Sequence, residues 1–204
     1  METTKKLFVY GGGGHGKVVA DIATNCGYEF LGYIDDNEKK QNAITFEEFL
    51  GLSGDFFVAL GIGSNEVRKK IFQKLNQNQI KIAALIHPKA VVANSVSVEE
   101  GAVVMAGAVI NSDAKIKKGV IINTSSVIEH DNIVEEFAHI SPNVAMGGGV
   151  FVGALSHIGI GSSIIHSIKI GDNVIIGAGS VVLKDIPSNA TAYGVPAKII
   201  EGRK

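Results

Sequence analysis

Aliphatic residues recur at every sixth position over the second half of the chain. Counted in sixes from Val92 to Val182, all sixteen positions hold Val, Ile or Met, and the fifth position of each hexad is mostly small or β-branched. A period of six fits neither the 3.6-residue turn of a helix nor the alternation of one strand, but it fits short strands joined by sharp corners. Three hexads would close one triangular coil with the first-position side chains inside, so the pattern predicts a three-sided prism of slightly more than five coils. At one inter-strand spacing per coil, this prism would be about 25 Å long.

Glycine is frequent at the second position of the later hexads, as in Gly147, Gly153 and Gly159. We interpret these glycines as a sign of tight turning at the corners. The repeat predicts a domain over residues 88–204, including a C-terminal tail.

Residues 1–87 lack the hexads and predict a short α/β unit. Strands are expected over 7–11, 30–36, 56–61 and 83–86, and helices over 15–26 and 65–78. Gly11, Gly13 and Gly16 fit G-x-G-x-x-G between a strand and a helix, a pattern typical of phosphate binding, and two aspartates follow about twenty residues on. This length supplies only one mononucleotide-binding half of a Rossmann fold, which favours a nucleotide diphosphate over NAD.

In this interpretation the loop Gly13, Gly14 and His15 holds the diphosphate or sugar of the ligand, while Asp35 and Asp36 bind its base or ribose. Gly61, together with Gly63, would let the backbone pass close to the ligand. A purely structural turn is the alternative.

Composition and charge exclude several classes of partner. The 204 residues are 46% apolar and carry 19 Lys and Arg against 20 Asp and Glu, so no basic stripe is available for nucleic acid. The four-residue apolar run before the first glycines is too short for a signal peptide or a membrane span, so we expect a cytoplasmic protein with no membrane partner. Cys26, the only cysteine, excludes an internal disulfide, and the spacing of the histidines does not indicate a metal site.

Four of the six histidines lie in the repeat, where their register predicts their direction. His139 and His157 occupy sixth positions, eighteen residues apart, so both should point outward on one face of the prism and not into its core. His130 and His166 occupy third positions, next to corners.

His130 lies between Glu129 and Asp131, where a carboxylate can orient the ring and raise its basicity. We therefore interpret it as a candidate general base, with a merely solvated surface histidine as the alternative. Nine residues, or one and a half faces, separate His130 from His139, so the two should meet only where prisms pack side by side.

Several segments together resemble a known family. NTSSVIEHD at 123–131, the following His139, the hexads and the closing YGVPAKII, behind YGGGGHG and IDD, are similar to the sugar acetyltransferases that include UDP-N-acetylbacillosamine N-acetyltransferases and sialic-acid O-acetyltransferases. The resemblance covers essentially the whole chain. It implies a left-handed parallel β-helix, a homotrimer with its active site between subunits, and direct acetyl transfer from acetyl-CoA to the C4 amine of a UDP-linked 4-amino-4,6-dideoxy sugar.

The resemblance also implies roles for particular residues. His130 would be the general base, supported by Asp131. Acetyl-CoA would contact Asn123, His139, the backbone of Gly148 at the oxyanion, Ile160, Ala178 and Lys198. The UDP-sugar would contact Gly13, Gly14, His15, Asp35, Asp36 and Gly61.

Three other functions stay open at this point. O-acetylation of a sialic acid or another sugar needs the same base and is the main alternative. An NAD-dependent oxidoreductase is disfavoured by the half-sized N-terminal domain, and a non-catalytic nucleotide-sugar-binding trimer is disfavoured by the Glu129-His130-Asp131 cluster.

Overall fold

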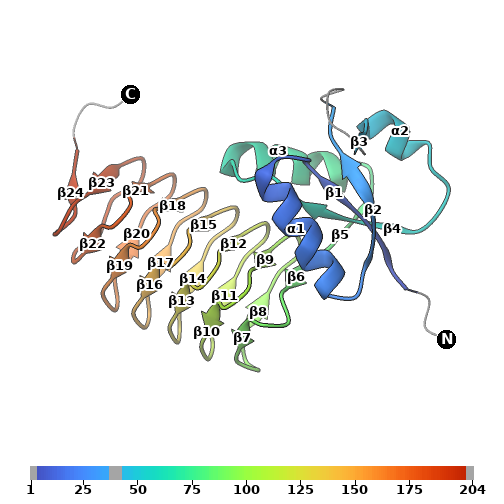
Figure 1. Cartoon of the computed structure of the whole chain (residues 1–204). Coiled ribbons are helices and arrows are strands. Elements are labelled where there is room, and N and C mark those ends of the chain that lie inside the picture. Colours follow the sequence, from blue (N-terminus) through green and yellow to red (C-terminus); the bar gives the residue numbers. More distant parts are fainter. Residues whose placement is uncertain (1–3, 37–42, 201–204) are drawn as a thin grey trace.

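The computed structural model describes residues 4–36 and 43–200 and contains an α/β domain followed by a three-sided parallel β-helix (Figure 1). The α/β domain lies at one end of the prism, and the C-terminal strands lie at the other. The expected fold class is confirmed, including the left-handed winding of the helix.

The α/β domain is a five-stranded parallel sheet in the order β3-β2-β1-β4-β5. Its elements in chain order are β1 (Lys6–Tyr10), α1 (Gly14–Asn25), β2 (Glu29–Ile34), β3 (Ala43–Ile44), α2 (Phe46–Leu50), β4 (Phe56–Leu60), α3 (Asn65–Gln77) and β5 (Lys81–Ile82). Successive side chains of β1 point to opposite faces of the sheet. Leu7 and Val9 pack with α1, whereas Phe8 and Tyr10 pack with α2 and α3. The strand order reverses between β1 and β4, so the loops after these two strands open on a crevice, as in doubly wound sheets.

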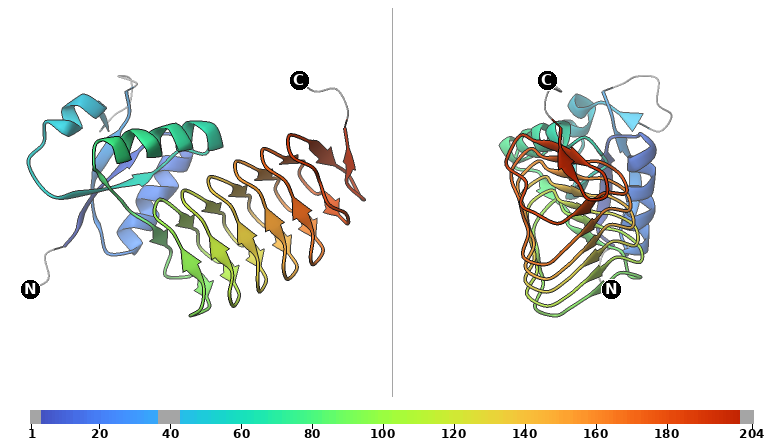
Figure 2. Two further views of the ribbon diagram at one scale, coloured as in Figure 1. Left: turned by 180° about the vertical axis from the view of Figure 1, so that it is seen from behind. Right: turned by 90° about the vertical axis from the view of Figure 1, so that its left-hand side faces the viewer.

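The repeat forms three sheets, one on each side of the prism (Figure 2). The first side holds β7 (Val91–Val92), β10 (Val109–Ile110), β13 (Val127–Ile128), β16 (Ala145–Met146), β19 (Ser163–Ile164) and β22 (Val181–Val182). The second side holds β8 (Ser97–Val98), β11 (Lys115–Ile116), β14 (Ile133–Val134), β17 (Phe151–Val152) and β20 (Lys169–Ile170). The third side holds β6 (Leu85–Ile86), β9 (Val103–Val104), β12 (Ile121–Ile122), β15 (His139–Ile140), β18 (His157–Ile158), β21 (Ile175–Ile176), β23 (Thr191–Tyr193) and the antiparallel β24 (Lys198–Ile199).

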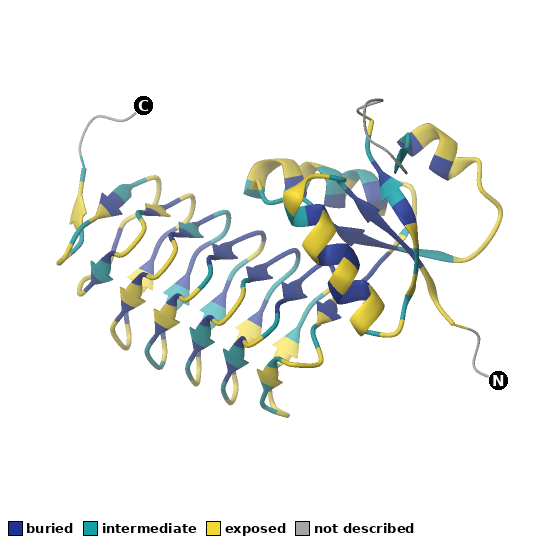
Figure 3. Ribbon diagram, in the orientation of Figure 1, coloured by how far each residue is buried: buried dark blue, intermediate teal, exposed yellow. Residues whose placement is uncertain are grey.

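Each strand from β7 to β22 contains a sixth-position residue that points outward and a first-position residue that points inward. The inward residues join one continuous apolar core together with small fifth-position residues, such as Ala102 and Ala138 (Figure 3). This is the arrangement that the hexads predict.

The corners turn at the fourth position of each hexad, not at the second. All fourteen fourth-position residues from Gly101 to Gly179 have φ between 53 and 72°. The second-position glycines serve a different purpose, so our interpretation of them was wrong. A Cβ on Gly147 would lie 2.6 Å from the backbone nitrogen of His166, and one on Gly153 would collide with the backbone of Gly171, so these glycines allow neighbouring coils to stack closely.

The junction between the two domains also differs from the expected single strand over 83–86. β5 ends the α/β sheet at Ile82, whereas β6 already pairs with β9 in the third side of the prism. The outward residues Leu85, Val103 and Ile121 of this side pack in one cluster with α1. The α/β domain therefore covers the first coils of the third side.

Within the described residues, no helix combines the length and apolar character needed to cross a bilayer.

Candidate active site

An open groove of about 620 Å³ runs along the third side and its corner toward the first side. Four of the residues assigned to acetyl-CoA line it together: Asn123, His139, Ile160 and Ala178. Ser141, Pro142, His157, Gly159, Ile175, Ile176 and Gly177 complete the lining. The exposed Ile160 and Ile175 make much of this wall apolar, which suits an extended, largely aliphatic ligand arm.

Three imidazoles line up where the α/β domain meets this groove. The ring of His139 lies 4.7 Å from that of His157 and 6.4 Å from that of His15, centroid to centroid. His139 points out of the prism as its register predicts, but it is only 9% exposed, because the α/β domain covers it. The prediction that His139 points away from the prism core was therefore correct. The side chain nevertheless does not reach the surface of the molecule, because the α/β domain covers it.

Hydrogen bonds select the tautomer of His139. The Oδ1 atom of Asn123 accepts from the backbone nitrogen of Thr124 at 2.8 Å, which directs the amide nitrogen of Asn123 toward His139 Nε2 at 3.0 Å. Since that amide nitrogen can only donate, Nε2 accepts and the proton of the neutral ring lies on Nδ1. Nδ1 is buried without a hydrogen-bond partner within the described residues.

Burial and neighbouring positive groups keep these rings neutral. Burial, followed by His157, Arg68 and His15, lowers the pKa of His139 to about 3, although the neighbouring Gly63 backbone favours the protonated ring. Burial and Arg68 likewise lower the pKa of His15 to about 4 and lower that of His157. The inner end of the groove is thus lined by uncharged imidazoles at neutral pH.

His130 lies on a different corner, between the first and second sides. Its Nδ1 atom is 2.7 Å from Asp131 Oδ2, and the side chains of both residues are well exposed. Hydrogen bonding to Asp131, with the charges of Asp131 and Glu129, raises the pKa of His130. The carboxylate holds the ring proton on Nδ1 and leaves Nε2 free to accept another, which is the arrangement of a general base.

Gly148 lies directly beneath this ring, one coil further on. A Cβ there would come within 2.6 Å of both Cε1 and Nε2 of His130, so only glycine leaves the imidazole in place. The structure therefore brings Gly148 to His130 and not to the groove.

In the α/β domain, three of the glycines around the crevice allow backbone segments to pack directly against one another. Gly11 has a φ of 100°, a Cβ on Gly16 would collide with the carbonyl of Gly11, and a Cβ on Gly61 would lie 2.7 Å from the same oxygen. Gly13 and Gly14, in contrast, are exposed at the start of α1, and a Cβ on Gly14 would meet nothing within 4 Å.

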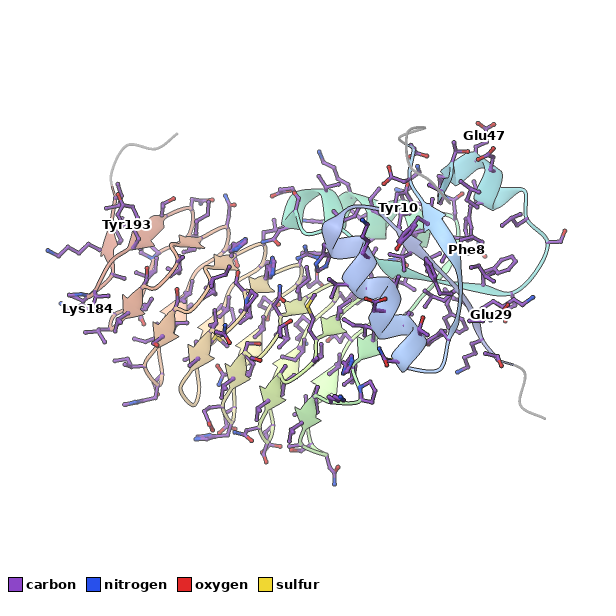
Figure 4. The ribbon with its side chains drawn as sticks, viewed as in Figure 1. Phe8, Tyr10, Glu29, Glu47, Lys184 and Tyr193 are labelled. Atoms are coloured by element: carbon purple, nitrogen blue, oxygen red, sulfur yellow. The ribbon has the colours of Figure 1, made fainter. Side chains whose placement is uncertain are left out.

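The two aspartates already have protein partners. Asp35 accepts a hydrogen bond from the Gly12 nitrogen at 2.8 Å and so shapes the glycine loop. Asp36 accepts from the Phe46 nitrogen at 2.9 Å and from the Tyr10 hydroxyl at 3.1 Å, and it lies 3.6 Å from Lys74. These bonds lower the pKa of Asp36, the bond from Phe46 most of all. Tyr10 and Phe8 mark this region in Figure 4.

The remaining sequence candidate, Lys198, lies on β24 at the far end of the prism, near Tyr193 (Figure 4). It is exposed and does not line the groove. No group of three or more His, Cys, Asp or Glu side chains in residues 4–36 and 43–200 is arranged to hold a metal ion.

Sequence reasoning missed Arg68, which is fully buried between the two domains. It shares the buried face of α3 with Phe72 and Leu75, four and seven residues on, so its helical spacing was the available signal. Ser141, whose hydroxyl lies 3.0 Å from His157 Nε2, was also missed.

Comparisons with known proteins agree with both halves of this arrangement. Residues 6–75 match a family model described as the PglD N-terminal domain. The UDP-N-acetylbacillosamine N-acetyltransferase of Bacillus subtilis (strain 168) is 38% identical over 115 residues. That match covers 50% of this chain and 51% of the relative, so the chain spans about half the length of this curated relative.

Two solved structures match over nearly the whole chain. The acetyltransferase domain of PglB from Neisseria gonorrhoeae FA1090, in complex with acetyl coenzyme A, has a TM-score of 0.92 at 36% identity and covers 97% of this chain and 100% of its own. A His-to-Asn mutant of perosamine N-acetyltransferase from Caulobacter crescentus, in complex with CoA and GDP-perosamine, has a TM-score of 0.90 at 35% identity over 97% of both chains. From the hexads, the glycine loop, the groove and these matches, we conclude that the chain belongs to the hexapeptide-repeat sugar acetyltransferase family.

Proposed function

We propose that the chain transfers the acetyl group of acetyl-CoA to the C4 amine of a UDP-linked 4-amino-4,6-dideoxy sugar. The groove is the observation that carries this proposal. Four residues that the family resemblance assigns to the acyl donor line it together, and its histidines lead to His15 at the glycine loop of the α/β domain. The names of the similar proteins support an amine acceptor and a nucleotide-linked sugar.

In the proposed mechanism, His130 Nε2 accepts a proton from the sugar amine as the nitrogen attacks the thioester carbonyl. The C–N bond forms first, and the Gly148 N–H next to the His130 ring donates to the oxyanion of the tetrahedral intermediate. The C–S bond then breaks, and the proton on His130 passes to the departing CoA thiolate. Asp131 holds the ring tautomer throughout, and no acyl-enzyme or metal takes part.

The other assignments follow the same proposal. Ile160 and Ala178 contact the pantetheine arm, and Lys198 meets a CoA phosphate as a point charge. Gly13, Gly14, His15, Asp35, Asp36 and Gly61 bind the nucleotide sugar. Because His130 and the groove lie on different corners, a neighbouring subunit supplies one of the two, which a homotrimer of side-by-side prisms provides. A cytoplasmic reaction stays our expectation from the sequence.

The acceptor is tested by measuring thiol release from acetyl-CoA with three acceptors: a UDP-linked 4-amino-4,6-dideoxy sugar, its GDP-linked counterpart and free sialic acid. We expect the UDP-linked amine to give the highest kcat/KM. Faster release with sialic acid would replace this proposal by O-acetylation, and a preference for the GDP-linked sugar would change the nucleotide.

The base is tested by His130→Ala, which should lower kcat by about 10²-fold or more, the usual scale for losing a general base. His166→Ala is the matched control, since His166 is exposed at the same hexad position two coils further on. Near-normal turnover of His130→Ala would remove His130 from this role.

A further inference from the structure

Arg68 combines complete burial with neutral partners. All five N–H groups of its guanidinium donate hydrogen bonds, and every acceptor is a backbone carbonyl or the side-chain amide oxygen of Asn65. Among the described residues, no carboxylate pairs with it. Burial lowers the pKa of Arg68 to about 9, so the group stays charged at neutral pH.

The guanidinium joins three segments that are distant in the sequence. Its Nε donates to Gly119 O at 2.6 Å, and one NH₂ group donates to Phe137 O at 2.7 Å, so it contacts the corners of two successive coils. The other NH₂ group donates to Ile62 O at 3.1 Å and Gly63 O at 3.0 Å, in the loop between β4 and α3. Asn65 extends the same contact to a third coil, with its amide nitrogen 2.8 Å from Leu155 O.

The joined segments are those that meet at the candidate site. The loop 61–64 follows β4 at the crevice of the α/β sheet, and the Phe137 corner directly precedes His139. Among the described residues, Arg68 is the only permanent cation whose charge lowers the pKa of all three neighbouring histidines, His15, His139 and His157. The other titratable groups that act on His139 are His15 and His157.

We propose that Arg68 is a positioning residue with two effects on the acetyl transfer. Its planar fork locks the loop 61–64 of the α/β domain onto the coils beside His139, and its charge adds to burial in disfavouring protonation of the neighbouring imidazoles. Protonation of His139 would turn Nε2 into a donor facing the amide donor of Asn123, so the neutral ring preserves this wall of the groove. Only the kinetic consequence rests on the proposed function.

Two substitutions separate these effects. Arg68→Gln keeps amide donors for the carbonyls but removes the charge, whereas Arg68→Lys keeps the charge but cannot form the planar fork. Asn65→Ala is the control for local packing, because it removes the bonds to Leu155 and Ser156 and one acceptor of the guanidinium but keeps the charge of Arg68.

The charge is tested by NMR titration of the His139 ring, assigned by its loss in His139→Gln. In Arg68→Gln the inflection should move upward by about one pH unit, toward the ordinary value of 6.5. It should stay low in Arg68→Lys and Asn65→Ala. This measurement needs no substrate, so it decides the electrostatic effect even if the proposed acetyl transfer is not observed; an unchanged titration in Arg68→Gln would overturn it.

The locking of the loop 61–64 by the planar guanidinium is tested by steady-state kinetics of the same variants, at a pH where His139 is neutral. We expect Arg68→Lys to raise the KM for the nucleotide sugar by about tenfold with a smaller change in kcat, because the loop is released while the base is untouched. An unchanged KM would overturn the locking role. If Arg68→Gln fails to fold, Arg68→Met takes its place in the titration, since Met is a long, unbranched side chain that fills the same space without a charge.

Discussion

His130 and His139 have opposite electrostatic surroundings, although both belong to one repeat. His130 is exposed beside two carboxyl groups, and hydrogen bonding to Asp131 raises its pKa. His139 is buried beside two imidazoles and a guanidinium, and its pKa falls to about 3. The first ring is suited to accept a proton near neutral pH, whereas the second stays neutral and shapes a binding surface.

This contrast predicts the pH dependence of the reaction. A general base must be unprotonated, so activity should rise with pH through the raised pKa of His130, above 6.5. In Asp131→Asn the inflection should move to lower pH because the carboxylate no longer stabilises the protonated ring. The plateau of kcat should fall by at least about tenfold, since an amide pairs with either ring tautomer.

Initial rates measured from pH 5 to 9 give both quantities. Glu129→Gln is the control, since it removes a neighbouring negative charge that has a smaller effect on the same ring. Equal pH profiles for Asp131→Asn and the wild type would mean that Asp131 does not support the base.

At the scale of the elements, the coils depend on two kinds of glycine. Gly153 at a second position faces the backbone of the next coil, while Gly161 at a fourth position has a φ of 67° and open space around it. The first is required by steric contact, and the second only by conformation. Asn143 and Asn173 already occupy fourth positions with φ of 57° and 53°.

Gly153→Ala should therefore lower the free energy of unfolding by about 1–3 kcal/mol, the range for overpacking a tight site. Gly161→Asn should change it by less than about 0.5 kcal/mol, because Asn tolerates the left-handed region. Denaturant unfolding of both variants checks this, and equal losses would contradict the distinct roles of the two positions.

The elements also show what could be predicted from the sequence. The hexads predict the strands of the prism from β7 to β22, because a first-position residue must be apolar to lie inside, whereas β23 and β24 lie beyond the last hexad. The docking of the α/β domain was missed, although Leu85, Val103 and Ile121 are apolar at outward positions eighteen residues apart. Apolar residues at these outward positions indicate that another domain covers this side of the prism. His139 holds the next outward position, eighteen residues after Ile121, which explains why it is buried.

The register of the hexads predicts on which side or corner each repeat residue of the candidate site lies, but not how these residues come together. Asn123, His139, Ile160 and Ala178 share a groove because all four lie on one side or corner. Gly148 was assigned to the same ligand but lies against His130, since its hexad position stacks over that residue. Arg68 carries no motif, and its partners are carbonyl groups, which no pattern of side chains reveals.

At the scale of the whole molecule, the separation of His130 from the groove gives the trimer a direct test. Subunits carrying His130→Ala lack the base, and subunits carrying Ala178→Trp have a blocked groove. If each site combines a base from one subunit with a groove from the next, an equal random mixture should recover about a quarter of the wild-type activity. Each homogeneous variant should be inactive.

Thiol release by co-expressed and separately purified variants provides the measurement, with native mass spectrometry to establish the number of subunits. A mixture as inactive as its parents would place the whole site within one chain and remove the reason for a shared cleft.

The contacts of Arg68 and Asn65 reach no further along the prism than the carbonyls of Leu155 and Ser156. Beyond this point, the ribbon of the later coils extends away from the described part of the α/β domain (Figure 1). The number of later coils can therefore change in steps of eighteen residues without disturbing the contacts between the α/β domain and the prism. Each added coil would extend the exposed wall of the groove by about 4.8 Å. If the proposed function holds, this gives the fold a way to accommodate longer acyl donors while the end beside the α/β domain stays constant.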